Sequence, residues 1–137
     1  MSPKLLIPIA SDHIAAGFPS PGDDYIENRI DLNEELISHP VSTFFLRVKG
    51  DSMSEAGILD GDLLIVDRSL EPRPGNIVVA ILDGSFTLKK LIYKEGLAYL
   101  EAEHPDYPII DLRNYENVQI WGVAIYPIHS LKNGKKA

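Results

Sequence analysis

The amino-acid sequence predicts a mostly β domain of roughly seven to nine strands, with one or two short helices and an extended N-terminal arm. Three observations predict this class. Short runs of branched and aromatic residues recur between residues 43 and 128, separated by turns that contain glycine or proline. The dipeptide Asp83-Gly84 stands between two such runs and is a strong hairpin signal. Prolines and glycines recur in the first 24 residues, where they exclude a long helix.

Residues 1–24 are expected to form the arm, and residues 25–137 a single domain large enough to bury a core. The apolar residues Leu5, Leu6, Ile7 and Ile9 favour a short strand or a docked extended segment. The alternative is a disordered terminus.

The first element expected inside the domain is a short helix over residues 30–37. Asp31 is a suitable N-cap, acidic residues follow in the first turn, and the apolar residues share one face. The dipeptide His39-Pro40 ends this helix, because a residue before proline disfavours helical geometry.

Strands are expected from there onward. The run Leu63 to Val66 is short and continuously apolar, as in a strand that is buried on both faces. Residues 52–57 are expected to form one helical turn that begins at Ser52. The predicted strands cover residues 43–48, 63–66, 77–82, 86–93, 97–100 and 118–128.

Composition excludes several classes of function. The chain has no cysteine, which removes disulfides, thiolate metal ligands and cysteine nucleophiles. Its formal charge of −7 argues against direct DNA binding by phosphate neutralisation. No apolar run approaches the roughly 18 residues of a membrane span. We therefore expect a cytoplasmic protein-handling domain.

The histidines offer neither a catalytic triad nor a metal site. No pair of them has the spacing of metal ligands on a helix, and none stands beside a serine in a way that suggests a triad. We expect turn or surface positions for all of them and no metal or cofactor. They are His13, His39, His104 and His129.

The remaining candidate for chemistry is a serine on a glycine-led turn, Gly50-Asp51-Ser52. It follows a predicted strand directly, so Ser52 is expected to expose its side chain on a sharp turn. If a helical turn begins there, its unpaired backbone N–H groups can hold an oxyanion. The alternative is that Ser52 is an N-cap without chemistry.

A serine without a histidine needs another base, and lysine is the known alternative. A solvated lysine has a pKa near 10.4, so only about one in 2,500 is neutral at pH 7. Burial in an apolar strand lowers that pKa. Lys89 and Lys90 lie in the apolar run 86–93 on opposite faces, so one can be buried while the other reaches water. Alternation leaves open which one, and the alternative is that both are exposed edge-strand charges.

These residues belong to a wider pattern that resembles the UmuD proteins, the self-processing subunits of an error-prone DNA polymerase (polymerase V). Their catalytic domain is related to that of the LexA repressor. The likeness covers nearly the whole chain. It is carried by Gly50-Asp51-Ser52-Met53, Gly61 to Asp67, Asp83 to Leu91, Gly17 to Pro21, Tyr25 to Leu32 and Trp121 to Ile125.

The resemblance implies a LexA/UmuD-type peptidase β-fold, similar to that of signal peptidases, and a set of roles. Ser52 matches the family's nucleophile and Lys89 its general base. The oxyanion donors match the backbone N–H groups of Asp51 and Ser52, and the bond to be cut matches Ala16-Gly17. UmuD proteins often have cysteine before the scissile glycine, where this chain has Ala16; alanine is also small, so the cut is expected to survive.

The resemblance also implies partners and a setting. Self-cleavage in the SOS response to DNA damage would be stimulated by RecA filaments on single-stranded DNA. The shortened chain, as a homodimer, would join a UmuC-type polymerase subunit in translesion synthesis. Two alternatives stay open, a binding module that never cuts and a LexA-like regulator. The second is weakened because only about sixteen residues precede the cut, too few for a helix-turn-helix.

Overall fold

The computed structural model describes residues 4–10, 13–14, 16–17 and 26–132, and the side chains of residues 26 and 27 lie outside the description. The chain divides into two compact units, Met1–Ser38 and His39–Ala137. The expected boundary between arm and domain, at residues 24 and 25, lies outside the described residues.

The N-terminal unit contains a two-stranded antiparallel sheet. β1 (Leu6–Ala10) pairs with β2 (Ile26–Asp31), and the register shifts after Ile9. The strand predicted around Leu6 is therefore present, whereas β2 was not predicted from the sequence.

A short helix, α1 (Leu32–Leu36), follows β2 directly. Asp31 is its N-cap, as predicted, and its carboxylate accepts a hydrogen bond from the Asn33 N–H at 3.0 Å. The helix is shorter than the expected range of 30–37, because Ile30 and Asp31 are paired in β2.

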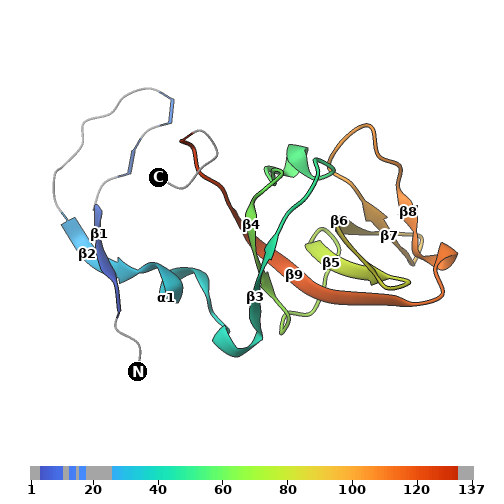
Figure 1. Cartoon of the computed structure of the whole chain (residues 1–137), viewed down its shortest axis with the longest axis horizontal. Coiled ribbons are helices and arrows are strands. Elements are labelled where there is room, and N and C mark those ends of the chain that lie inside the picture. Colours follow the sequence, from blue (N-terminus) through green and yellow to red (C-terminus); the bar gives the residue numbers. More distant parts are fainter. Residues whose placement is uncertain (1–3, 11–12, 15, 18–25, 133–137) are drawn as a thin grey trace. The chain divides into compact units, whose positions relative to one another are not determined.

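The C-terminal unit is a seven-stranded antiparallel sheet in the order β3-β4-β9-β5-β6-β7-β8. Figure 1 shows the long strand β9 passing between β4 and β5. This architecture confirms the mostly β class. The strands are β3 (Thr43–Arg47), β4 (Leu63–Asp67), β5 (Ile77–Leu82), β6 (Ser85–Lys94), β7 (Leu97–Glu101), β8 (Ile110–Asp111) and β9 (Val118–Ile128), with short 3-10 turns at Pro40–Ser42, Ser54–Ala56 and Leu112–Asn114.

The predicted hairpin between β5 and β6 is present. Leu82 pairs with Ser85, so Asp83 and Gly84 form a two-residue loop. Their φ angles are +46° and +87°, the left-handed geometry of turns that match the twist of paired strands. The hairpin fixes the register of β6 and hence the position of Lys89 opposite Val78.

Two clusters of buried side chains form the core of this unit. One lies along β5, β6, β7 and β9, and the other lies under the loop that follows β3. Burying each such aliphatic side chain stabilises the fold by about 1.5–3 kcal/mol. The first contains Val78, Ala80, Leu82, Leu91, Leu100 and Val123, and the second contains Met53, Ile58, Leu64, Val66 and Val79.

Gly122 allows β9 to pass close to the buried end of β4. A Cβ atom at this position would lie 2.5 Å from Val66 Cγ1, which is closer than carbon atoms approach. Val66 is fully buried, so it has no free space into which to move.

Within the described ranges, no helix has the length and apolar character that crossing a membrane requires. The same ranges contain no cluster of three or more acidic or histidine side chains that could hold a metal ion.

Candidate active site

Ser52 lies on the loop between β3 and β4, and backbone geometry makes this loop turn sharply. Gly50 has φ +94°, a conformation that glycine adopts without strain. Its N–H donates to Asp60 Oδ1 at 2.7 Å, and the Ser54 N–H donates to the Asp51 carbonyl at 3.0 Å. These bonds place Ser52 inside a tight turn directly after the strand.

The helical turn begins later than predicted. It covers Ser54–Ala56 and its N-cap is Met53, which makes no side-chain capping bond. The prediction that the turn starts at Ser52 is therefore wrong, and so is the alternative of Ser52 as an N-cap. The reason is the turn closed between Asp51 and Ser54, which occupies the residues around Ser52.

The Ser52 hydroxyl meets the amine of Lys89. Lys89 Nζ lies 3.1 Å from Ser52 Oγ, although 37 positions separate the two residues in the chain. The other contacts of the amine are Thr87 Oγ1 and the Leu88 carbonyl, each at 3.0 Å. Among the described residues, all partners of this amine are uncharged.

Burial changes the protonation of this lysine. Lys89 is 9% exposed, and burial lowers its pKa from the ordinary value of 10.5. A lowered pKa raises the fraction of neutral amine near neutral pH, and only the neutral amine can accept a proton from a hydroxyl.

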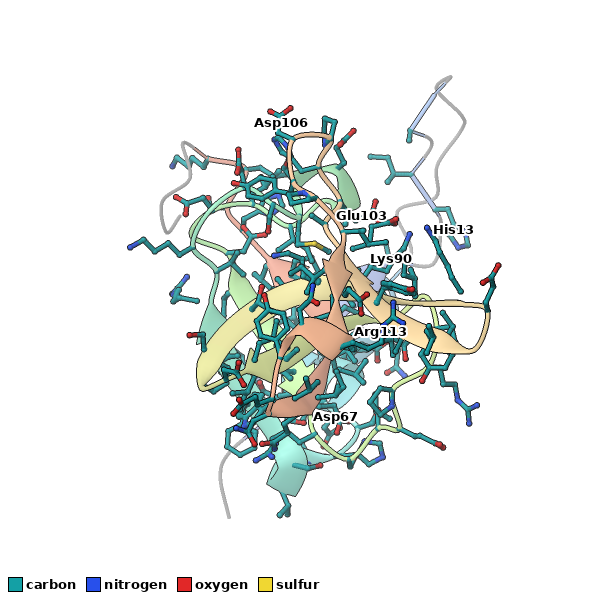
Figure 2. All side chains as sticks on the ribbon, turned by 90° about the vertical axis from the view of Figure 1, so that its right-hand side faces the viewer. His13, Asp67, Lys90, Glu103, Asp106 and Arg113 are labelled. Carbon is teal, nitrogen blue, oxygen red and sulfur yellow. The ribbon has the colours of Figure 1, made fainter. Side chains whose placement is uncertain are left out.

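The next residue has the opposite environment. The Lys90 side chain is 33% exposed, and its amine lies 2.8 Å from Glu103 Oε1 and 3.8 Å from Glu101 Oε1. The hydrogen bond that Lys90 donates to Glu103 and the charges of both carboxylates raise the pKa of Lys90. Figure 2 shows the side chains of Lys90 and Glu103 close together. Lys89 is thus the buried lysine, and the alternative that both are exposed is wrong.

Two backbone donors stand beside the serine. In the part of the chain that the structure describes, neither the Asp51 N–H nor the Ser52 N–H donates a hydrogen bond to another residue. Unpaired N–H groups on a rigid turn are the donors that oxyanion holes use.

Ser52 and Lys89 line one cleft of about 380 Å³ in the C-terminal unit. Its walls are largely apolar, so a bound peptide would replace water around the amine. The lining residues are Leu46, Arg47, Val48, Lys49, Gly50, Ser52, Met53, Leu64, Val79, Phe86, Thr87, Leu88 and Lys89.

The expected cleavage site lies in the N-terminal unit. Ala16 and Gly17 are both exposed there, and no atom lies within 4 Å of the place where a Cβ on Gly17 would sit. Ala15, the other small residue of this step, lies outside the described residues. Cleavage at Ala16-Gly17 stays a prediction.

Sequence reasoning did not single out Thr87 as a partner of the lysine. The pattern contained a usable signal, because a residue two positions before Lys89 on a strand shares its face. It also missed the contacts that Asp51 makes with the loop after β7, for which adjacent sequence gives no indication.

Two of the histidines contact buried carboxylates outside the candidate site. His129 contacts the buried Asp62 at 3.1 Å, and His39 hydrogen-bonds the buried Asp67. Burial alone would raise the pKa of Asp67, but hydrogen bonds from Ser69 and His39 outweigh it and hold the pKa at about 2. Asp67 therefore stays ionised at neutral pH at the far end of β4 from the cleft.

Comparison with known proteins places the chain in a family. Residues 8–125 match the family model described as Peptidase S24-like. The chain is 45% identical over 122 residues to protein ImpA of Salmonella typhimurium, covering 89% of this chain and 83% of ImpA. It is 42% identical over 124 residues to protein MucA of Escherichia coli, covering 89% and 84%.

A further protein matches over about half of its own length. The LexA repressor of Shewanella baltica is 41% identical over 114 residues, which span 82% of this chain and 54% of the repressor. These matches confirm the resemblance that the motifs around Ser52 and Lys89 indicated. The chain belongs to the Peptidase S24-like family as one of its UmuD-type members.

Proposed function

We propose that the chain is a self-cleaving Ser-Lys peptidase that cuts its own Ala16-Gly17 bond. The observation that carries the proposal is the 3.1 Å approach of the Lys89 amine to the Ser52 hydroxyl, in a cleft where that amine has only uncharged partners. Serine and lysine at this distance can exchange a proton directly.

The proposed reaction uses the serine, the lysine and the two backbone N–H groups. Neutral Lys89 takes the proton of Ser52 Oγ as that oxygen attacks the carbonyl carbon of Ala16. The Asp51 and Ser52 N–H groups stabilise the negative charge that develops on the carbonyl oxygen. The Lys89 ammonium protonates the Gly17 amine, which leaves as the peptide bond breaks. Water then hydrolyses the acyl-serine and restores both side chains.

Two features of Lys89 support the role of base. Burial lowers its pKa, which raises the neutral fraction near pH 7. Thr87 Oγ1 and the Leu88 carbonyl hold the amine in place beside the serine. A fixed amine loses little entropy when the hydroxyl and the peptide align.

The substrate is part of the same protein, so the reaction depends on presentation of the arm. The small side chain of Ala16 lets the peptide lie close to Ser52 in the cleft. A RecA filament on single-stranded DNA would act as activator by favouring the docked arm over free ones.

The product would act in DNA damage tolerance. Shortened chains would form a homodimer in the cytoplasm and join a UmuC-type subunit as the accessory part of an error-prone translesion polymerase. The net charge of −7 agrees with a role that reaches DNA through protein partners. The similarity to ImpA, MucA and LexA supports this setting.

Mass spectrometry after incubation of the purified chain at about pH 9–10 tests the proposal. High pH neutralises lysine without an activator, so loss of residues 1–16 is expected. Ser52→Ala is the matched control and should stay intact. A wild-type chain that also stays intact with an activating filament would instead support a binding module that does not cut.

A second test addresses the bond itself. Gly17→Trp should block cutting, because bulk beside the scissile bond would clash with the cleft. The position of Gly17 is exposed and has room for a larger side chain, so folding should be unaffected. Unchanged cutting in Gly17→Trp would show that the cleaved bond is not Ala16-Gly17.

A further inference from the structure

The loop between β7 and β8 holds the loop that carries Ser52. We call residues 50–57 the nucleophile loop. The Glu55 N–H donates to the Glu103 carbonyl at 2.9 Å, and the Glu103 N–H points at Met53 Sδ at 3.4 Å. Two side chains of the β7–β8 loop reach further, to the residue directly before the serine.

Both oxygens of the Asp51 carboxylate have partners on that loop. The Tyr107 hydroxyl donates to Asp51 Oδ1 at 2.7 Å, and His104 Nε2 lies 3.5 Å from Asp51 Oδ2. The Asp106 N–H donates to His104 Nδ1 at 3.1 Å, so the proton of the neutral ring sits on Nε2 and faces Asp51. The rings of His104 and Tyr107 pack edge to face with centroids 5.1 Å apart.

These contacts do not serve to satisfy a buried charge. The Asp51 side chain is 62% exposed, so water could solvate it without the tyrosine. The hydrogen bond from Tyr107 lowers the pKa of Asp51, which shows that the hydroxyl favours the ionised carboxylate. What the contacts change is the freedom of the backbone at Asp51.

The backbone at this point carries the proposed oxyanion donors. Asp51 and Ser52 supply the two N–H groups that, within the described chain, have no acceptor on another residue, and the peptide between them also sets the direction of Ser52 Oγ. On the other side, Gly50 is fixed by its bond to Asp60. Together with the Tyr107 contact, this bond restrains the backbone near the peptide that joins Asp51 to Ser52.

We propose that Tyr107, assisted by His104, is a positioning residue for Ser52: it fixes the Asp51 carboxylate and thereby the oxyanion donors and the nucleophile. The inference rests on the proposed self-cleavage. Among the described residues, the Tyr107 hydroxyl donates to Asp51 and makes no hydrogen bond to Ser52 or Lys89, so it would act on the serine through Asp51.

Self-cleavage kinetics of Tyr107→Phe test the inference. This variant keeps the ring and removes only the hydroxyl, and we expect cutting at the high-pH plateau to slow by about threefold to tenfold. The midpoint of the pH–rate profile should not move, because Lys89 is untouched. Tyr93→Phe, at an exposed tyrosine of β6, is the matched control and should cut at the wild-type rate.

A double-substitution cycle separates positioning from general weakening of the fold. Asp51→Ala removes the other half of the contact at an exposed side chain, so it should fold even if Tyr107→Phe does not. Combined with Tyr107→Phe, it should cut no more slowly than Asp51→Ala alone. Additive slowing, or an unchanged rate in Tyr107→Phe, would overturn the inference.

Hydrogen exchange supplies a readout that does not need cutting. In a Ser52→Ala background, Tyr107→Phe should speed exchange of the amides at residues 51–53 and leave those of β9 unchanged. If the wild-type chain never cuts, the proposed function fails, and this measurement alone decides the inference. Unchanged exchange at residues 51–53 would then refute it.

Discussion

Lys89 and Lys90 are neighbours on β6, yet their surroundings are opposite. Lys89 points into the cleft beside Ser52 and has only uncharged partners, so burial lowers its pKa. Lys90 points toward Glu103 and Glu101 on the other side of the strand, and these carboxylates raise its pKa. Successive side chains on a strand point to opposite faces, and here the two faces shift the lysine pKa in opposite directions.

The difference shows that burial lowers the pKa of a lysine when no carboxylate compensates for the lost contact with water. Lys90 has the partner that stabilises a charged amine at a protein surface. Lys89 has acceptors that orient the amine, Thr87 Oγ1 and the Leu88 carbonyl, but within the described chain it has no carboxylate to hold its proton. A buried lysine without an acidic partner is costly to the fold and suited to a general base.

Substitution of the two lysines should give the largest contrast. Lys89→Ala removes the proposed base and is expected to slow self-cleavage by about a thousandfold or more. Lys90→Ala, the matched control on the opposite face, should cut within about twofold of wild type, because its contacts are with Glu103 and Glu101. Gel analysis of cutting over several days at pH 9 measures both rates. Equal losses would show that Lys89 is not the base.

The pH dependence of cutting should report the lowered pKa of Lys89. Below that pKa the neutral fraction of the amine rises tenfold per pH unit, so the rate should rise with a slope of one on a logarithmic scale. The plateau should begin below the ordinary lysine value of 10.5, because burial lowers the pKa in the folded chain. Lys90→Ala should give the same midpoint. A midpoint at or above 10.5 would mean that the titrating lysine is solvated.

The sequence was sufficient to predict the frame of this site. The Asp83-Gly84 loop fixes which residues of β6 pair with β5, and alternation then places the two lysines on opposite faces. Alternation cannot say which face is covered, because that depends on β3 and its following loop, far away in the chain. Only the resemblance to UmuD proteins pointed to Lys89.

Other features lacked any local sequence signal. β8 is two residues long, too short for a periodic pattern, and β2 contains Ile30 and Asp31, which also suited a helix start. The late start of the 3-10 turn at Ser54 depends on the bond that closes the turn at Asp51. The Tyr107 contact with Asp51 joins residues 56 positions apart. Such contacts are set by tertiary packing.

A smaller effect is expected from the acceptor that orients Lys89. Thr87→Val removes the hydroxyl 3.0 Å from the amine and leaves the Leu88 carbonyl, so plateau cutting should slow by about threefold to tenfold. The lost acceptor also favoured the charged amine, so the midpoint should fall, not rise. Kinetics over pH 7–11 separate the two effects. Ser85→Ala, at the exposed start of β6, is the control. An unchanged pH–rate profile in Thr87→Val would show that Thr87 does not orient the Lys89 amine.

The last and smallest contrast concerns stability. Lys89→Met, made in a Ser52→Ala background to prevent cutting, should raise the free energy of unfolding by about 0.5–2 kcal/mol, because an apolar side chain suits the buried position better. The gain should shrink as pH rises toward 10.5. Between the lowered pKa and 10.5 the unfolded chain binds more protons than the folded one, so the protein that keeps Lys89 becomes more stable as pH rises.

Lys90→Met should act in the opposite direction, since the raised pKa of Lys90 marks a favourable pair that is present below 10.5 and lost above it. Urea unfolding at pH 7 and pH 10 measures the free energy of unfolding of both variants. A Lys89→Met variant that is less stable than its parent would show that the buried lysine does not destabilise the fold.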